Sequence, residues 1–340
     1  MRAIVYRGAG GVEVLSLATV PDPVPGSHQL RVRVRAAGLN RADILQRRGA
    51  YPAPPGWPAD IPGLEYTGEV ETLGPGATRW KPGDRIMGLV GGGGHAEYVV
   101  VHEDEVLPVP ANLAWTDAAA IPEAFLTAYD ALVTRGRLKS GENVLIHAVA
   151  SGVGTAAVQL GKALHATVLG TSRTPTKLER MGALGLDIGI DTSTAGFRDQ
   201  VSQPVQLILD VLGGPAFQDN LTVLAARGRL VMLGFLQGPV APHANLDVIL
   251  RKRLEIIGTA MRTRGLEERI QLVSEFRAAV LPLFGSHVLS DQPMHSLSHP
   301  SRVGALLQPI VHAVFPMAEV AAAHSAMERN EGIGKIVLSW

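Results

Sequence analysis

The chain contains no cysteine, so disulfide bonds, thiolate metal ligands and cysteine nucleophiles are all excluded. Its 31 basic residues balance its 31 acidic ones, and aromatic residues make up only 5% of the sequence. This composition argues against nucleic acid or an anionic membrane surface as a partner. There is no run of about 18 apolar residues and no signal-peptide layout at the N-terminus. We therefore expect a cytoplasmic protein that acts on a small molecule.

The length of 340 residues and two different patterns of apolar and polar residues indicate two domains. The first third alternates apolar and polar residues in short runs separated by Gly and Pro turns, which predicts a mostly antiparallel β domain. From Trp115 onward, helical patterns alternate with short apolar strands such as "NVLIHAV", "ATVLGTS" and "VQLILDVL". That alternation is typical of a doubly wound parallel sheet. The predicted fold class is thus α/β.

The stretch "NVLIHAVASGVGTAAVQL" reads as a strand, a glycine-rich turn and a helix in immediate succession. Its centre, Gly152-Val153-Gly154, begins a GxGxxA fingerprint. In such a motif the first Gly permits a tight turn, and the second allows close approach of a pyrophosphate. The helix N-terminus then offers free N–H groups to that pyrophosphate. We expect a dinucleotide here; the alternative is a tight turn without a ligand.

The end of the next strand distinguishes between the two nicotinamide dinucleotides. NAD enzymes place an Asp or Glu there for the ribose 2′-hydroxyl. This chain has Ser172 and Arg173, with Lys177 one turn further on, and no carboxylate. A hydroxyl with two cations suits a 2′-phosphate, so the sequence predicts NADPH; the alternative is a solvated, basic start of a helix.

With these motifs, the chain resembles the medium-chain dehydrogenase/reductases, specifically their zinc-independent quinone oxidoreductase branch. The resemblance covers roughly residues 1–280 and 308–338. It rests on "LNRADILQRRGAY", "IPGLEYTGEV", "WKPGDRIMGL", "AAAIPEAFLTAYDAL", "NVLIHAVASGVGTAAVQL" and "GKIVL". It implies a GroES-like catalytic domain from residues 1–122 and 265–340, with a Rossmann NADP-binding domain, residues 123–264, inserted between them.

The resemblance also implies that the polar segment from Leu39 to Pro58 holds no metal. Zinc-dependent relatives carry Cys and His ligands where this chain has Asn40 and Leu64, and zinc favours such ligands. The segment is instead expected to line the substrate cleft, with Asn40 and Tyr51 facing a carbonyl oxygen. A structural alternative is that Asn40 caps the helix "RADILQRR", with Asp43 supporting its N-terminus.

Further positions carry over from the family one at a time. Thr127 is expected near the nicotinamide, Gly234 and Phe235 at a strand end that meets the cofactor, and Arg264 in contact with the cofactor. Two departures stand out. Asp191-Thr192 replaces the family's Asn-Tyr, which removes a group beside the adenosine phosphate. The stretch 285–304 is long, and its histidines, His287, His295 and His299, are spaced as in a surface loop rather than a metal site.

The predicted function is that of an NADPH-dependent quinone reductase without zinc, acting as a homodimer. Two alternatives stay open: a reductase of enone or alkenal double bonds, and an NADPH-binding structural or regulatory protein with little turnover. The sequence does not identify the physiological acceptor. Nor does it decide between one-electron and two-electron reduction, or between a dimer and a tetramer.

Overall fold

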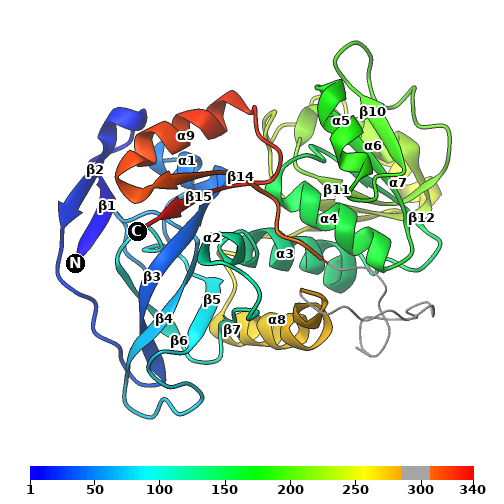
Figure 1. Cartoon of the computed structure of the whole chain (residues 1–340). Helices are drawn as coiled ribbons and strands as arrows, with labels where there is room; N and C mark the ends of the chain where they lie inside the picture. Colours follow the sequence, from blue (N-terminus) through cyan, green and yellow to red (C-terminus); the bar gives the residue numbers. More distant parts are fainter. Residues whose placement is uncertain (285–306) are drawn as a thin grey trace. The chain divides into compact units, whose positions relative to one another are not determined.

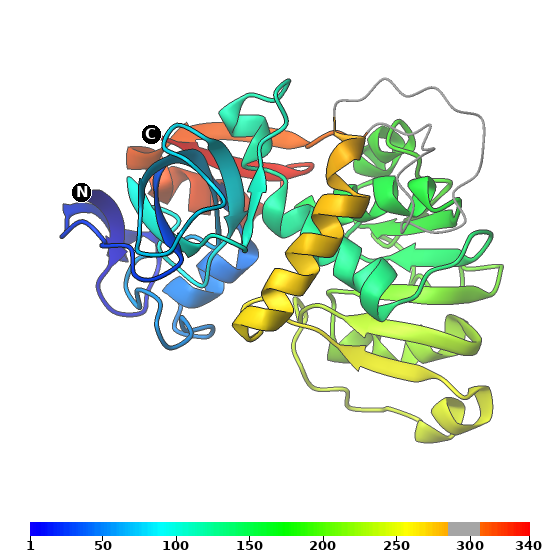
Figure 2. The same cartoon turned by 90° about the horizontal axis from the view of Figure 1, so that it is seen from below.

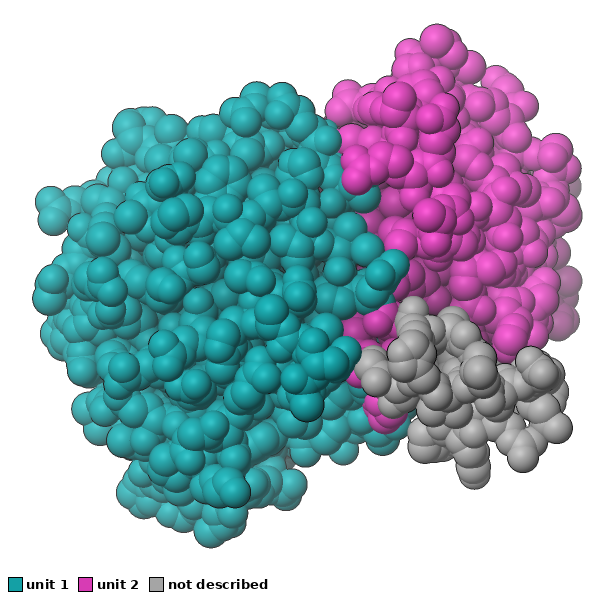
Figure 3. Space-filling view, viewed as in Figure 1, with its two compact units in different colours: residues 1–126, 262–281, 308–340 teal, residues 127–261, 282–307 magenta. Residues whose placement is uncertain are grey.

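The computed structural model describes residues 1–284 and 307–340, and these divide into two compact units. Unit 1 consists of Met1–Leu126, Arg262–Leu281 and Gln308–Trp340 (Figure 3). Unit 2 consists of Thr127–Met261 with the described residues of 282–307. One boundary between the units falls inside helix α3 (Pro122–Tyr129). The described residues of 282–307 group with unit 2 rather than with unit 1. The predicted loop at 285–304 lies outside the described residues.

Unit 1 contains the predicted β domain (Figure 1). A seven-stranded sheet has the order β14-β15-β3-β4-β5-β7, with β6 paired to β3, and β1 and β2 form a separate pair. The strands are β1 (Arg2–Tyr6), β2 (Leu15–Thr19), β3 (Gln29–Leu39), β4 (Glu65–Leu73), β5 (Arg85–Leu89), β6 (Tyr98–His102), β7 (Val106–Pro108), β14 (Val311–Pro316) and β15 (Lys335–Ser339). The helices are η1 (Val12–Val14), α1 (Arg41–Arg47), α2 (Trp115–Ala118), α3 (Pro122–Tyr129), α8 (Leu266–Ala279), η4 (Met317–Glu319) and α9 (Val320–Arg329).

Strand β3 shows why this region forms a sheet with one buried and one solvent-exposed face. Its residues alternate between buried and more exposed positions, with Leu30, Val32 and Val34 in the core. On the other face, Arg31 and Arg33 pair with Glu71, and Arg35 pairs with Glu69, on the neighbouring strand β4. The arginines are therefore a solvated cross-strand network rather than a basic binding surface.

The last strand of the chain lies inside this sheet. β15 runs parallel to β14 on one side and antiparallel to β3 on the other, with Ile336 opposite Leu39. Helix α9 packs on β14 and β15, and α8, the long gold helix in Figure 2, packs on β7. Unit 1 is thus completed only by residues from the C-terminal end of the sequence.

Unit 2 contains a six-stranded, entirely parallel sheet in the order β10-β9-β8-β11-β12-β13. Its strands are β8 (Asn143–Ile146), β9 (Thr167–Ser172), β10 (Ile188–Asp191), β11 (Val205–Asp210), β12 (Leu224–Met232) and β13 (Glu255–Gly258). Its helices are the π-helix η2 (Asp130–Arg135), α4 (Gly152–Ala163), α5 (Pro175–Gly182), α6 (Gly214–Val223) and α7 (Leu246–Lys252); η3 (Leu281–Leu283) follows α8. Doubly wound sheets have this strand order, with β8 and β11 flanking the point where the order reverses.

The predicted fold class is confirmed: an α/β chain with a GroES-like sheet and a parallel Rossmann sheet. Three short strands, β7, β10 and β14, are not evident from the sequence pattern. β10 has four residues, one of them Gly189, too few for an apolar run to stand out. Within residues 1–284 and 307–340, none of the helices combines the length and apolar character that a membrane span requires.

Candidate functional site

The turn between β8 and α4 is built around its helix start. Ser151 is the N-cap of α4, and its hydroxyl oxygen accepts a hydrogen bond of 3.1 Å from the backbone N–H of Gly154. A side chain at Gly154 would overlap the backbone carbonyl oxygens of Ala148 and Val149. Glycine here therefore lets the first helical turn lie directly on the turn that precedes it.

The left-handed residue of this turn is Ala148, with a φ of 49°. From the sequence, the tight turn is expected at Gly152, but Gly152 is already the first residue of α4 and Val153 the second. A positive φ is uncommon for a residue with a Cβ, and such conformations persist where the surroundings determine them. The neighbouring Val149 supplies part of that constraint, since its N–H donates to the carbonyl oxygen of Thr171 on β9.

The strand order brings most of the predicted cofactor residues to one edge of the sheet in unit 2. Ser172 ends β9, and Gly234 and Phe235 follow β12, at the same carboxyl edge as the turn before α4. The Ser172 hydroxyl oxygen accepts from the N–H of Thr174 at 3.1 Å. Phe235 is 53% exposed, which is unusual for a large apolar side chain and consistent with a ligand-facing position.

The two predicted cations follow Ser172 directly. Arg173 is exposed, and Lys177 lies half-buried in the first turn of α5. On the adjacent strand β10, Asp191 is opposite Ser172, and its carboxylate accepts from the N–H of Ser193 at 2.8 Å. This carboxylate thus has a local backbone partner of its own.

Two predicted residues are not at the strand ends of unit 2. Thr127, on α3, is buried, with 8% of its surface exposed. Arg264 belongs to unit 1, where its backbone carbonyl oxygen accepts from Arg269 and its guanidinium is 3.4 Å from the Glu268 carboxylate. The cofactor roles of Thr127 and Arg264 stay predictions.

A buried polar group beneath the glycine-rich turn is absent from the sequence-based predictions. His147, which directly follows β8, bonds through Nδ1 to the Thr171 hydroxyl (3.0 Å) and through Nε2 to Asn220 (2.8 Å). Asp210, at the end of β11, accepts from the N–H groups of Leu212 (2.7 Å) and Gly213 (3.3 Å). The available signal is that two adjacent buried strands, "NVLIH" and "VQLILD", both end in a titratable residue.

Burial sets the ionisation of this pair. It lowers the pKa of His147 and raises the pKa of Asp210, and the attraction between the two opposes both changes. Both effects of burial favour the neutral forms. His147 and Asp210, at the ends of β8 and β11, are therefore held by hydrogen bonds next to the glycine-rich turn.

In unit 1, Asn40 is the N-cap residue of α1, as the structural alternative predicts. Its backbone N–H donates to the Asp43 carboxylate at 2.8 Å, and its own carbonyl oxygen accepts from the N–H of Asp43. Its side chain points elsewhere. The amide nitrogen donates to Glu65 (2.9 Å) and weakly to the carbonyl oxygen of Gly38 (3.4 Å), while the amide oxygen accepts from Lys335 (2.5 Å).

Glu65 and Lys335, which are not among the predicted residues, form a buried ion pair beside Asn40. Their side chains are 0% and 6% exposed, and 2.6 Å separates the ammonium from the carboxylate. The second Glu65 oxygen accepts from the backbone N–H of Glu123 at 2.8 Å, and Lys335 also donates to the carbonyl oxygen of Leu39 at 2.9 Å. This pair orients the Asn40 amide from both sides.

Asp43 and His95 are two further fully buried titratable groups near α1. Asp43 accepts from the N–H of Gly63 at 3.0 Å. Burial raises its pKa, against the attraction of His95. Burial likewise lowers the pKa of His95, against the attraction of Asp43. Burial thus favours the neutral forms of both groups, and Asp43 supports the start of α1 through its hydrogen bond with the N–H of Asn40.

Tyr51, the second predicted acceptor residue, lies beneath a guanidinium. The Cζ atom of Arg262 is 5.0 Å from the centre of the Tyr51 ring, and its Nη1 donates to the Tyr51 carbonyl oxygen at 2.8 Å. Burial raises the pKa of the Tyr51 hydroxyl, and Glu123 adds to that increase. The protonated phenol, a hydrogen-bond donor, is thus the favoured form.

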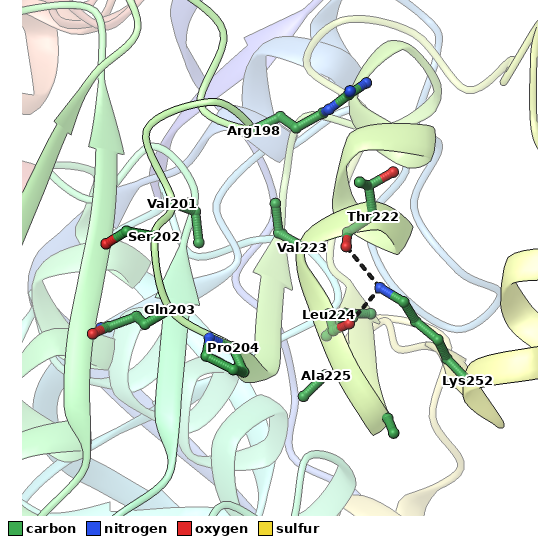
Figure 4. Close-up of a pocket in the computed structure, with 11 residues that line it drawn as sticks. Arg198, Val201, Ser202, Gln203, Pro204, Thr222, Val223, Leu224, Ala225 and Lys252 are labelled. Atoms are coloured by element: carbon green, nitrogen blue, oxygen red, sulfur yellow. Dashed lines mark hydrogen bonds between the residues drawn. The ribbon is translucent and has the colours of Figure 1, made fainter.

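A pocket of about 530 Å³ lies at the other end of the parallel sheet (Figure 4). It is bounded by the loop from Val201 to Pro204 and by the start of β12, where the ammonium of Lys252 donates to the carbonyl oxygens of Thr222 and Leu224. Ligands of doubly wound sheets bind at the carboxyl ends of the strands. We therefore assign this pocket no part in dinucleotide binding.

The sequence matches two protein-family models. One, the alcohol dehydrogenase GroES-like domain, matches residues 26–111, and the other, described as a zinc-binding dehydrogenase, matches residues 152–278. The human synaptic vesicle membrane protein VAT-1 homolog is 30% identical over 99% of this chain and 86% of its own length. The quinone oxidoreductase of Lama guanicoe is 30% identical over 99% of this chain and 97% of its own length. A solved structure of a mycobacterial protein complexed with NADPH superposes with a TM-score of 0.84, at 27% identity and full coverage of both chains.

The residues at the expected ligand positions do not fit a zinc ion, despite the name of the second family model. At the expected ligand positions, the Asn40 side chain is engaged with Glu65 and Lys335, and Leu64 is an apolar residue with 4% exposure. The adjacent Glu65 carboxylate is already paired with the ammonium of Lys335. The described residues include no group of three or more His, Cys, Asp or Glu side chains that could hold a metal ion.

We predict that Lys335→Met lowers the free energy of unfolding by about 3–5 kcal/mol, because it leaves the Glu65 carboxylate buried without a counter-ion. Lys162→Met is the matched control: its partner Asp187 is 2.9 Å away, but both side chains are about one-third exposed. That exposed pair should contribute only about 0–1 kcal/mol. Urea unfolding of both variants measures the two losses in the free energy of unfolding. Equal losses would show that the buried pair contributes no more to stability than the exposed one.

Proposed function

Because this chain belongs to the zinc-independent quinone oxidoreductase branch of the medium-chain dehydrogenase/reductase superfamily, we propose that it reduces quinones with NADPH. The chain is an oxidoreductase that uses a nicotinamide cofactor on a small-molecule substrate. The preference for NADPH and the identity of the acceptor are the specific parts of the proposal. The observation that carries it is the glycine-rich start of α4, at the carboxyl edge of the sheet where the strand order reverses.

In this proposal, unit 2 holds the dinucleotide. The N–H groups of Gly152 and Val153 at the start of α4 face the pyrophosphate, and the helix dipole favours its negative charge. Gly154, whose N–H is bonded to Ser151, lets the backbone approach the pyrophosphate closely. Ser172, Arg173 and Lys177 bind the 2′-phosphate through a hydroxyl and two cations. The remaining contacts with the cofactor come from Thr127, Gly234, Phe235 and Arg264.

Bound NADPH supplies a hydride, that is, one proton and two electrons, from C4 of its nicotinamide. A quinone that takes up this hydride and one proton from water becomes a hydroquinone, leaving NADP⁺. The protein then needs neither a metal nor a general acid of its own. Its contribution is to hold the acceptor in place and to donate hydrogen bonds as negative charge develops on the acceptor oxygen.

Asn40 and Tyr51 are the donors proposed for that oxygen. The Tyr51 hydroxyl is kept protonated by burial. One hydrogen of the Asn40 amide makes only the weak 3.4 Å bond to Gly38, so it is the one available to an acceptor. The other hydrogen and the amide oxygen hold the side chain in position.

We expect Tyr51→Phe to lower kcat/KM for a quinone by roughly ten- to a hundredfold, about 1.4–2.7 kcal/mol, at saturating NADPH. The ring and its contact with Arg262 remain, so the melting temperature and the Kd of NADPH should change little. Tyr98→Phe is the control, since Tyr98 also lies beside arginines but on the exposed face of the β3–β6 pair.

A set of acceptors tests the activity itself. Oxidation of NADPH should be faster with quinones than with enones or alkenals. Faster reduction of alkenals would replace the proposed substrate class. Negligible turnover with every acceptor would instead favour a protein that binds NADPH for a structural or regulatory purpose.

NADPH should bind more tightly than NADH, and Lys177→Ala should narrow that difference by about 1–2 kcal/mol through loss of a charge-assisted contact with the 2′-phosphate. Arg180→Ala provides the control, because it removes the same charge from the last turn of the same helix. Titration of both variants with the two cofactors gives the four affinities. Equal affinity of the unaltered protein for NADPH and NADH would refute the assignment.

We also propose that the protein is a homodimer joined at the edge of unit 2. β13 is the edge strand of the parallel sheet, and the preceding helix α7 exposes Leu246 and Leu250, at 67% and 77%. Unpaired edges and exposed apolar residues favour association with a second copy. Sedimentation at micromolar concentration should give twice the chain mass of 36.0 kDa; a monomer alone would contradict the proposal.

A further inference from the structure

Arg262, which is 8% exposed, is a buried cation that forms no ion pair among the described residues. The arginines that follow it differ, since Arg264 pairs with Glu268 and Arg269 pairs with Glu105. Burial of a cation without a counter-ion is unfavourable. The position of this charge therefore needs a reason beyond packing.

The guanidinium of Arg262 is held entirely by neutral acceptors. Nε and Nη2 both donate to the carbonyl oxygen of Gly91, at 2.9 and 2.6 Å. Nη1 donates to the carbonyl oxygen of Tyr51 at 2.8 Å, and Nη2 to the side-chain oxygen of Gln46 at 2.6 Å. These bonds fix the plane of the guanidinium without cancelling its charge.

That fixed plane lies over the ring of Tyr51, with 5.0 Å between Cζ and the ring centre. Tyr51 begins the loop "YPAPPGWP", whose prolines have no N–H to donate. The hydrogen bond from Arg262 to the Tyr51 carbonyl oxygen and the contact of Arg262 with the Tyr51 ring thus position the Tyr51 side chain. The loop itself supplies few backbone hydrogen bonds to do so.

The cation also acts on the phenol. A positive charge over an aromatic face attracts its electrons, which strengthens the hydroxyl as a hydrogen-bond donor. Other groups oppose or modify this effect: burial and Glu123 raise the pKa of Tyr51, while Arg262 lowers it. The negative charges of Asp43 and Glu123 and the phenols of Tyr51 and Tyr6 act in turn on the guanidinium.

We propose that Arg262 is a positioning residue for the acceptor site. Arg262 holds Tyr51 in place and polarises its hydroxyl toward the oxygen of the bound acceptor. The inference rests on the proposed function, because it assumes that Tyr51 donates to the acceptor. It also adds to that function a preference for acceptors on which negative charge develops, such as quinones.

A double-mutant cycle tests the coupling. In the otherwise unaltered protein, Arg262→Gln should lower kcat/KM for a quinone about tenfold at saturating NADPH. In the Tyr51→Phe background the same substitution should lower it less than twofold, because the hydroxyl through which Arg262 acts is already absent. The same tenfold loss in both backgrounds would overturn the proposal, since it would show a general structural role.

Arg277→Gln is the matched control. Arg277 is a half-buried arginine of unit 1 that donates to the carbonyl oxygen of Val106 and lies 5.9 Å from the ring of Trp80. Its replacement removes a comparable contact far along the sequence from Tyr51. It should leave kcat/KM for a quinone within twofold in both backgrounds; a tenfold loss would make the Arg262 result unspecific and count against the proposal.

Titration of the Tyr51 phenol gives a readout that does not depend on turnover. In protein labelled with 3-fluorotyrosine, the fluorine resonance that is lost in Tyr51→Phe should titrate at higher pH in Arg262→Gln than in the unaltered protein. Arg277→Gln should not move it. An unchanged midpoint in Arg262→Gln would overturn the electrostatic part of the proposal.

The two measurements separate the possible failures. If Tyr51→Phe leaves kcat/KM unchanged, the proposed acceptor site is wrong, while the titration still decides whether Arg262 polarises Tyr51. If Arg262→Gln does not fold, Arg262→Lys replaces it in the double-mutant cycle. An ammonium group keeps the positive charge but cannot donate in one plane to the carbonyl oxygens of Gly91 and Tyr51. The loss in kcat/KM must again depend on Tyr51, and the midpoint must stay near that of the unaltered protein.

Discussion

The Glu65 carboxylate is fully buried, and each of its partners comes from a different part of the chain. Lys335 reaches it from the last strand, Asn40 from the cap of α1, and the backbone of Glu123 from the start of α3. A Cβ on Gly38 would overlap one of its oxygens, so even the neighbouring strand is shaped to admit it. One desolvated charge thus determines where four segments of unit 1 must meet.

Buried polar groups near the candidate sites are accommodated in two ways. Beneath the glycine-rich turn, His147 and Asp210 are satisfied by hydrogen bonds, and burial favours their neutral forms. Around α1 and the Tyr51 loop, two buried cations are found: Lys335 pairs with Glu65, whereas Arg262 has only neutral hydrogen-bond acceptors among the described residues. A phosphate site built on backbone N–H groups has little need of buried charge, whereas a metal-free site for a developing anion benefits from a fixed cation.

Local patterns in the sequence predict what depends on local structure. The longer strands of both sheets, the strand–turn–helix order around Gly152 and the solvated arginines of β3 follow from periodicity and turn residues. The partners of Asn40 do not, because Glu65 and Lys335 are brought to it by strand pairing between distant segments. The roles of Ala148 and Arg262 are also inaccessible from the sequence. One depends on a backbone angle, and the other on which loops surround a single guanidinium.

The position of β15 has a consequence for how the protein is made. The strand lies between β14 and β3 in the sheet of unit 1, although in the sequence it follows the whole of the stretch Thr127–Met261. Unit 2 takes nearly all of its described residues from the single stretch Thr127–Met261, so its sheet can form while synthesis continues. During that interval the N-terminal strands are complete in sequence but lack the neighbour that covers the edge of β3. Until β15 is made, residues 36–39 of β3 lack this partner, and an unpaired strand edge of this kind favours association with other chains.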